Sequence, residues 1–123
     1  MRTVVAKRIG KSMLSLMLHD PDSSVRMAVA ERLDFDMLQA LCGDPDAAVR
    51  LKVVQRLPRQ HLHSMRHDAD WRVRYEIALR IGEQYLNELA QDEDEMVREA
   101  ALMRLLELKL NNESSGRRVY GQN

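Results

Sequence analysis

Aromatic residues make up only 4% of this 123-residue chain, and it contains a single cysteine, Cys42. One cysteine excludes an intramolecular disulfide and any zinc or iron–sulfur site ligated only by cysteines of this chain. A free thiol together with eight methionines is typical of a reducing compartment, so we expect a cytoplasmic protein. The sequence also lacks an apolar run of the roughly 18 residues that would span a bilayer, and we expect no membrane association.

No surplus of either charge is present, because 19 basic residues balance 19 acidic ones. Nonspecific nucleic-acid binding draws on excess positive charge and on aromatic side chains that stack with bases, and both are scarce here. The chain also has no glycine-rich phosphate loop, no Gly-x-Ser-x-Gly elbow and no His-Glu-x-x-His sequence. The sequence therefore predicts a protein that is not an enzyme, carries no cofactor and does not bind nucleic acid.

What the sequence does contain is a repeat with a period of 24 residues. Two aspartates, a Val-Arg dipeptide and a second arginine six positions later recur at this spacing. The dipeptides are Val25-Arg26, Val49-Arg50, Val73-Arg74 and Val97-Arg98, and Met1-Arg2 falls in the same register. We divide the chain into a partial unit, 1–19, and four units, 20–43, 44–67, 68–91 and 92–115. Stacked units of this kind bury together an apolar face that one unit cannot bury alone.

Each unit predicts one α-helix and one tighter helical segment. The second aspartate of the turn is suited to cap a helix, because its carboxylate accepts a hydrogen bond from an unpaired backbone N–H. In the first full unit the helix runs from about Ser23 to Leu33, with an apolar stripe at i, i+4 and i+8. It ends before a shared position occupied by Gly10, Asp34, Pro58 and Gly82. The few residues left suit a 3₁₀ segment.

These motifs resemble the bacterial leucine-rich repeat variant family, in its period and in the segments Asp44-Pro45-Asp46-Ala47-Ala48-Val49-Arg50 and Asp68-Ala69-Asp70-Trp71-Arg72-Val73-Arg74-Tyr75. The resemblance implies an all-α, right-handed superhelical solenoid in which α and 3₁₀ helices alternate in two parallel layers. About four and a half repeats form it. A family member carries a cysteine-rich cluster-binding domain ahead of its repeats. This sequence has no such cysteine cluster, so no redox role is carried over.

We expect residues 1–110 to form one repeat domain and residues 111–123 to form a frayed tail. Glu113 falls on a position that is an inward leucine in earlier units, so packing is predicted to stop near Leu110. At the other end, Leu16 and Leu18 replace mostly small or polar residues. This apolar first unit predicts self-association, a docked partner or a missing upstream segment; the intact repeat register argues against a targeting peptide.

The repeated arginines have two interpretations. They form either a ladder of ion pairs with the turn aspartates, which we favour, or a face that binds phosphate or nucleic acid. The charge distribution adds a further expectation. Residues 1–19 carry four basic and no acidic residues, whereas unit 92–115 carries three basic and seven acidic. Head-to-tail contact between copies, or a partner with complementary ends, is a reasonable hypothesis.

The third full unit departs from the repeat pattern. Trp71 and Tyr75 stand where other units carry small, aliphatic or charged residues, and Arg72 and Arg74 lie beside them. Trp, Tyr and Arg are enriched at binding hot spots, although packing between turns explains the two aromatic residues equally well. We therefore predict a protein–protein interaction module that contacts its partner through these four residues and assembles through Leu16 and Leu18.

Three histidines, His61, His63 and His67, lie within seven residues of one another. His63 and His67 are at helical i, i+4 spacing, but no third ligand is evident. His19 falls two repeats away from His67 in the stack, beyond the reach of a shared metal ion. We interpret the cluster as a solvated surface and predict no metal site, with metal sensing as the alternative.

Overall fold

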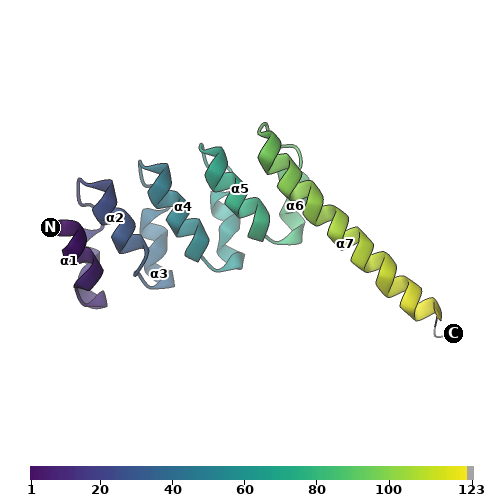
Figure 1. The fold of residues 1–123 in the computed structure, drawn as a ribbon, viewed down its shortest axis with the longest axis horizontal. Helices are drawn as coiled ribbons and strands as arrows, with labels where there is room; N and C mark the ends of the chain where they lie inside the picture. The colour runs from purple at the N-terminus through teal and green to yellow at the C-terminus, as the bar shows by residue number, and fades with distance from the viewer. Residues whose placement is uncertain (122–123) are drawn as a thin grey trace.

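A computed structural model describes the backbone of residues 1–121 and the side chains of residues 1–114. These residues form an all-helical stack with no strand among them, and successive repeats lie side by side along the long axis of the molecule (Figure 1). The alternation of α and 3₁₀ segments predicted from the repeat is confirmed. The elements are α1 (Arg2–Arg8), η1 (Lys11–Met17), α2 (Ser23–Ala30), α3 (Phe35–Leu38), η2 (Gln39–Leu41), α4 (Ala47–Arg56), η3 (Arg59–Met65), α5 (Trp71–Arg80), η4 (Glu83–Tyr85), α6 (Leu86–Leu89) and α7 (Glu95–Gly121), where η marks 3₁₀ helix.

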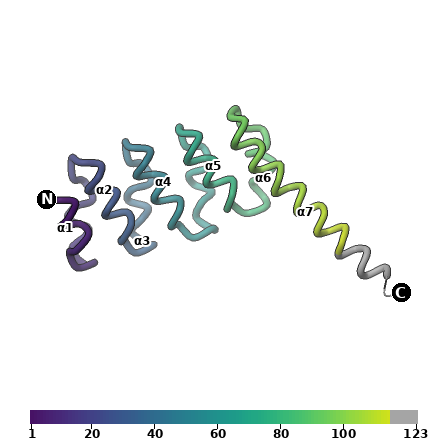
Figure 2. The backbone as a smooth tube through the Cα atoms, in the orientation of Figure 1, coloured from purple at the N-terminus to yellow at the C-terminus, as the bar shows by residue number. Residues whose placement is uncertain are grey.

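The first layer of the stack consists of α1, α2, α4, α5 and α7. In the four full repeats the predicted aspartate caps the helix. The carboxylates of Asp22, Asp46, Asp70 and Asp94 each accept a hydrogen bond of 2.8–2.9 Å from the backbone N–H two residues ahead. This bond satisfies one of the N–H groups that a helix N-terminus leaves unpaired. The capped turns follow one another along one edge of the stack (Figure 2).

The second layer varies more than the repeat predicts. It is entirely 3₁₀ in η1 and η3, but it is divided between α and 3₁₀ helix in the repeats that contain α3 and α6. A leucine is buried in all of them, at Leu14, Leu38, Leu62 and Leu86, and a second apolar side chain three residues later is buried in the last three, at Leu41, Met65 and Leu89. Both helix types therefore present the same apolar positions to the core.

The core lies between the two layers. Each first-layer helix after α1 packs against the second-layer segment that precedes it in the chain: α2 against η1, α4 against η2, α5 against η3 and α7 against α6. The predicted stripe of Val25, Val29 and Leu33 is buried against this segment, as are its equivalents in the following repeats. Each layer of contacts is thus shared between neighbouring repeats, as expected for a solenoid.

The last helix differs from the sequence prediction. α7 continues to Gly121, whereas the sequence predicted that residues 111–123 would fray; residues 122 and 123 lie outside the described part of the chain. The reason is that Leu106 occupies the position at which Gly10, Asp34, Pro58 and Gly82 end the earlier helices. Leucine is a good helix former, and nothing stops the helix there. α7 consequently leaves the stack and projects beyond it (Figure 1). None of the helices described combines the length and the apolar character needed to cross a membrane.

Candidate binding surface

In every full repeat except the last, the arginine of the Val-Arg dipeptide pairs with an aspartate of the next repeat, and Arg2 of the partial unit does the same. In each case the Nε atom donates to a carboxylate oxygen, so that Arg2, Arg26, Arg50 and Arg74 bind Asp20, Asp44, Asp68 and Asp92 at 2.7–2.9 Å. All four aspartate side chains are buried or nearly so. The same carboxylate accepts a bond from a backbone N–H of its own turn. We call this set of ion pairs the turn ladder.

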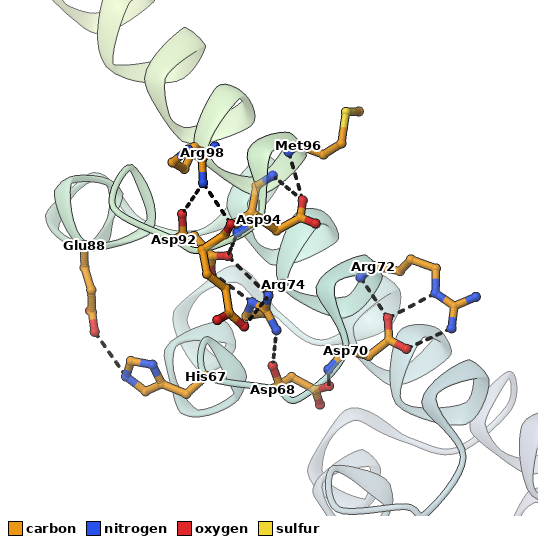
Figure 3. Close-up of polar contacts among 12 residues, drawn as sticks. His67, Asp68, Asp70, Arg72, Arg74, Glu88, Asp92, Asp94, Met96 and Arg98 are labelled. Atoms are coloured by element: carbon orange, nitrogen blue, oxygen red, sulfur yellow. Dashed lines mark hydrogen bonds and ion pairs between the residues drawn. The ribbon is translucent and has the colours of Figure 1, made fainter.

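Three arginines of the turn ladder, Arg26, Arg50 and Arg74, also donate to a backbone carbonyl of their own repeat. Arg74 donates through Nη1 to the carbonyl of Asp68 at 2.7 Å and through Nε to Asp92 at 2.9 Å, so it lies between two turns (Figure 3). Burial lowers the pKa of Arg74, but the hydrogen bond to Asp92 and the neighbouring carboxylates raise it by more. The guanidinium therefore stays charged, and the hydrogen bonds compensate for the desolvation that burial imposes.

The second repeated arginine forms a separate series, which we call the carbonyl ladder. Arg56 donates to the carbonyls of Ala30 and Leu33 at 2.8 and 2.7 Å. Arg32, Arg80 and Arg104 make equivalent bonds to the preceding repeat. These carbonyls lie at helix C-termini, where they have no partner within the helix and carry partial negative charge. Burial and nearby Arg59 lower the pKa of Arg104, and they outweigh the opposite effect of the Glu83 and Glu107 carboxylates.

Together the two ladders account structurally for eight of the repeated arginines; of the other two, Arg98 donates to the backbone carbonyls of Asp92 and Glu93, and Arg8 is exposed. Within the described residues, no buried side-chain nitrogen or oxygen is left without a hydrogen-bond partner. A phosphate group would have to displace a carboxylate or a backbone carbonyl to reach these guanidinium groups. The geometry supports the ion-pair interpretation over a phosphate-binding face.

Trp71 and Tyr75 come together on α5. Their rings meet edge to face with centroids 6.4 Å apart, and Trp71 is exposed whereas Tyr75 is half-buried against the core. Arg72 lies beside them at the surface and binds only Asp70, the cap of its own helix. Its hydrogen bonds lower the pKa of Asp70 to about 2.

Arg74 requires a correction. The sequence grouped it with the exposed contact residues, but it is only 7% exposed and is held in the turn ladder. The physical reason is that α5 turns successive side chains by about 100°, so Arg74 and Arg72 point in different directions. We therefore remove Arg74 from the candidate surface and retain Arg72.

Tyr75 of this pair also lines a groove between α5 and α7. The groove encloses about 290 Å³ and is lined by Tyr75, Leu79, Met96, Glu99, Ala100, Met103, Arg104 and Glu107. Leu79, Met96 and Met103 are exposed apolar side chains that sequence analysis missed. The sequence does indicate two of them, because the repeat position of Leu79 and Met103 is polar or charged in the other repeats, where it is Lys7, Glu31 and Gln55. Trp71, Tyr75 and Leu79 also follow i, i+4, i+8 spacing on one helix face.

The two leucines predicted for assembly have different environments. Leu16 is 74% exposed on η1, whereas Leu18 is 8% exposed and belongs to the core. Leu18 cannot therefore form part of an assembly surface, and this half of the prediction is corrected. Leu18 packs into the apolar core, whereas Cys42, Arg66 and Ala90 at the same position of later repeats are only half-buried.

The histidines are used in separate surface contacts. The ring of His63 stacks on Tyr85 at a centroid distance of 5.7 Å, and His67 lies 3.1 Å from Glu88 (Figure 3). No group of three metal-ligating side chains occurs in the part of the chain that the structure describes. The lone thiol, Cys42, is half-buried, and burial raises its pKa, which makes it a weak nucleophile.

Comparison with known proteins gives a structural match. A solved structure described as a leucine-rich repeat variant with a novel repetitive protein structural motif is 37% identical in sequence, and the match covers 81% of this chain with a TM-score of 0.78. The chain spans 43% of that protein's length. No family model matches the sequence, and no curated protein matches it.

Proposed function

Because this chain is built from leucine-rich repeat variant repeats, we propose that it is a non-catalytic cytoplasmic module that binds a protein partner. A stack of repeats offers an extended surface on which side chains vary without disturbing the core. A fold does not specify what it binds, so the binding function rests on the exposed side chains of this particular chain. The observation that carries it is the contact between exposed Trp71 and half-buried Tyr75, because Tyr75 also lines the α5–α7 groove.

The chemistry of the groove indicates what it binds. Its lining includes the apolar and aromatic side chains of Tyr75, Leu79, Met96 and Met103 together with the acidic side chains of Glu99 and Glu107. Methionine side chains adapt to different apolar shapes, and an aromatic pair supplies a rigid contact area. The only arginine lining the groove, Arg104, is already bound to the carbonyls of Ala78 and Ile81. A partner that inserts apolar side chains and places basic ones at the edge fits these groups.

Affinity capture from nuclease-treated lysate of the native host tests this function, with bound proteins identified by mass spectrometry. We expect a stoichiometric protein partner that the Trp71→Ala, Tyr75→Ala double variant fails to retain. Phe35→Ala is the matched control, because Phe35 is also an exposed aromatic residue but lies on α3, away from the groove. Far-UV circular dichroism checks that both variants keep their helices.

Three results would contradict the proposal. Equal capture by the parent and the double variant would remove the groove from the contact surface. Loss of helical signal in the double variant would support packing as the role of the two aromatic residues. In a parallel capture without nuclease, the chain could instead retain nucleic acid. Such binding, if it falls steeply as salt rises, would favour the arginine face as the binding surface.

A further inference from the structure

The α5–α7 groove carries two carboxylates that no ion pair neutralises. Glu99 and Glu107 line the groove and are exposed, and none of the ion pairs formed among residues 1–114 involves either of them. The first aspartate of each turn, by contrast, is held by an arginine of the turn ladder. Two unpaired carboxylates beside apolar side chains give the groove a negative potential.

The basic side chains around the groove do not cancel this potential. Arg104 lines the groove but donates to two carbonyls of the preceding repeat, and Arg72 binds the cap of its own helix. Arg98 and Lys109 lie five and six residues from Met103 on α7, which turns their side chains more than about 100° around the helix from it. Even with Arg104 counted in full, the lining has two carboxylates against one guanidinium, so it favours a basic partner.

The acidic and apolar groups of the groove follow helical spacing along α7. Glu99, Met103 and Glu107 are each four residues apart, so they lie on one face, with the carboxylates about 12 Å apart along the helix axis. α5 packs beside α7 (Figure 1) and contributes Tyr75 and Leu79 to the same lining. The groove therefore offers an apolar middle with an acidic group on each side of it.

The size and the walls of the groove indicate the form of the partner. Its volume of about 290 Å³ is at the lower limit for enclosing a small-molecule ligand, but it can accept side chains from a partner's surface. Both walls are helices, and no strand edge exists among the described residues, so an extended segment would find no backbone groups to pair with. A helix satisfies its own backbone hydrogen bonds and needs only side-chain contacts.

We propose that the α5–α7 groove binds a basic amphipathic helix. An apolar residue at position i of this helix contacts Met103 and Tyr75. Lysine or arginine at i−4 and i+4 pairs with Glu99 and Glu107, because the spacing of the basic residues equals that of the carboxylates. The inference rests on the binding function proposed above and names the chemistry of its partner.

Two synthetic peptides of about 15–20 residues, long enough to form a helix, test this inference. Both are built on alanine and glutamine and carry leucines at i−3, i and i+3. The matching peptide has lysines at i−4 and i+4, on the leucine face. The control peptide has the same composition, but its lysines stand at i−2 and i+2, about 200° around the helix from the central leucine.

The fluorescence of Trp71 measures the binding of these peptides to the full chain. Trp71 is the only tryptophan of the chain, it is exposed, and it contacts Tyr75 of the groove. Because the peptides contain no aromatic residue, any change in emission comes from the chain. We expect a saturable change with the matching peptide and an affinity about fivefold higher than that of the control peptide.

The double variant Glu99→Gln, Glu107→Gln removes both charges and keeps good helix formers. We expect it to bind the matching peptide about fivefold more weakly, to lose the preference between the peptides and to bind with less dependence on salt. The double variant Glu31→Gln, Asp36→Asn is the matched control, because it changes the net charge equally at exposed residues outside the groove lining. It should bind as the parent chain does.

Several results would overturn the basic helix as the partner. They are the absence of saturable binding, equal affinity of the two peptides, and equal binding by the parent and the Glu99→Gln, Glu107→Gln variant. Tighter binding of a proline-rich peptide with the same lysines and leucines would assign the groove to an extended segment. Tighter binding of a matching peptide with glutamate in place of lysine would reverse the charge assignment.

Capture from lysate separates this inference from the proposed function. A protein partner lost by the Trp71→Ala, Tyr75→Ala variant but fully retained by the Glu99→Gln, Glu107→Gln variant would leave the function standing and overturn the basic helix. A partner retained equally by the parent and both variants would contradict the function itself. Loss of the partner in both variants supports the function and the basic helix together.

Discussion

Arg72 and Arg74 lie two residues apart on α5, yet they belong to different parts of the molecule. Arg74 lies in the turn ladder, where it joins the turns at Asp68 and Asp92, and its side chain is buried. Arg72 lies at the surface and bonds only within its own turn. Arg74 has an equivalent in every repeat, whereas the position of Arg72 is Ser24, Ala48 and Met96 elsewhere. In this fold, residues that repeat build the stack, and residues that vary are available for binding.

Replacing each arginine in turn tests whether the buried and the surface arginine differ in their contribution to stability. Arg74→Ala leaves the carboxylate of Asp92 nearly buried without its cation, and we expect it to lower the free energy of unfolding by about 3–5 kcal/mol. Arg72→Ala, as its control, should change stability little, because an exposed ion pair contributes little. Urea unfolding followed by far-UV circular dichroism measures both. Equal losses in the two variants would contradict the distinction between buried and surface arginines.

We expect a smaller loss of unfolding free energy when an arginine of the carbonyl ladder is replaced. Arg80→Ala removes the donor to the carbonyls of Val54 and Leu57 at the end of α4, at a cost of about 1–3 kcal/mol. The loss should be smaller than for Arg74 because no buried charge is left unpaired. Arg80→Lys keeps a donor and a positive charge and should recover part of the stability. The same urea series measures this, and a loss larger than that of Arg74→Ala would reverse the ranking of the two ladders.

The smallest effect concerns the helix cap and depends on pH. Asp70→Ala removes the acceptor for the backbone N–H of Arg72 and should cost about 1 kcal/mol at neutral pH. In the folded chain the pKa of Asp70 is lowered from 3.8 to about 2. Its contribution is therefore fully present above the ordinary pKa and is lost as pH falls through the folded value.

The difference in stability between Asp70→Ala and the parent chain should accordingly shrink as the pH is lowered from about 4 toward 2. Thermal unfolding over this pH range measures the shrinkage. Asp70→Asn serves as the matched variant, because asparagine still caps a helix but does not titrate. A difference between Asp70→Ala and the parent that is constant with pH would contradict a role for the ionised carboxylate.

Much of the fold could be predicted because each repeat is specified by features that act over a few residues of sequence. The capping aspartates, the apolar stripe of each helix and the shared stop at Gly10, Asp34, Pro58 and Gly82 all act within a few residues of one another. The same register contains the explanation for the long α7, since Leu106 replaces the stop. The handedness of the superhelix remains a prediction from the family resemblance.

The candidate surface was predicted only in part, because it depends on which side chains a neighbouring repeat covers. Sequence analysis found Trp71 and Tyr75 from their departure from the repeat, and the structure brings their rings together. It missed Leu79, Met96 and Met103, which complete the groove from two different helices. It also misplaced Arg74 and Leu18, because burial of both side chains depends on packing between repeats.

The sequence by itself thus determined the repeat, its helix caps and its apolar stripes, since these follow from hydrogen bonds and periodicities within one unit. Only the tertiary structure decided that each turn arginine reaches the aspartate 18 residues ahead and that its counterpart reaches back 23 or 26 residues to helix carbonyls. It alone also distinguished buried from exposed members of the same repeat position. The reason is that burial here is a property of the contact between neighbours, and a repeat at an end of the stack lacks one of them.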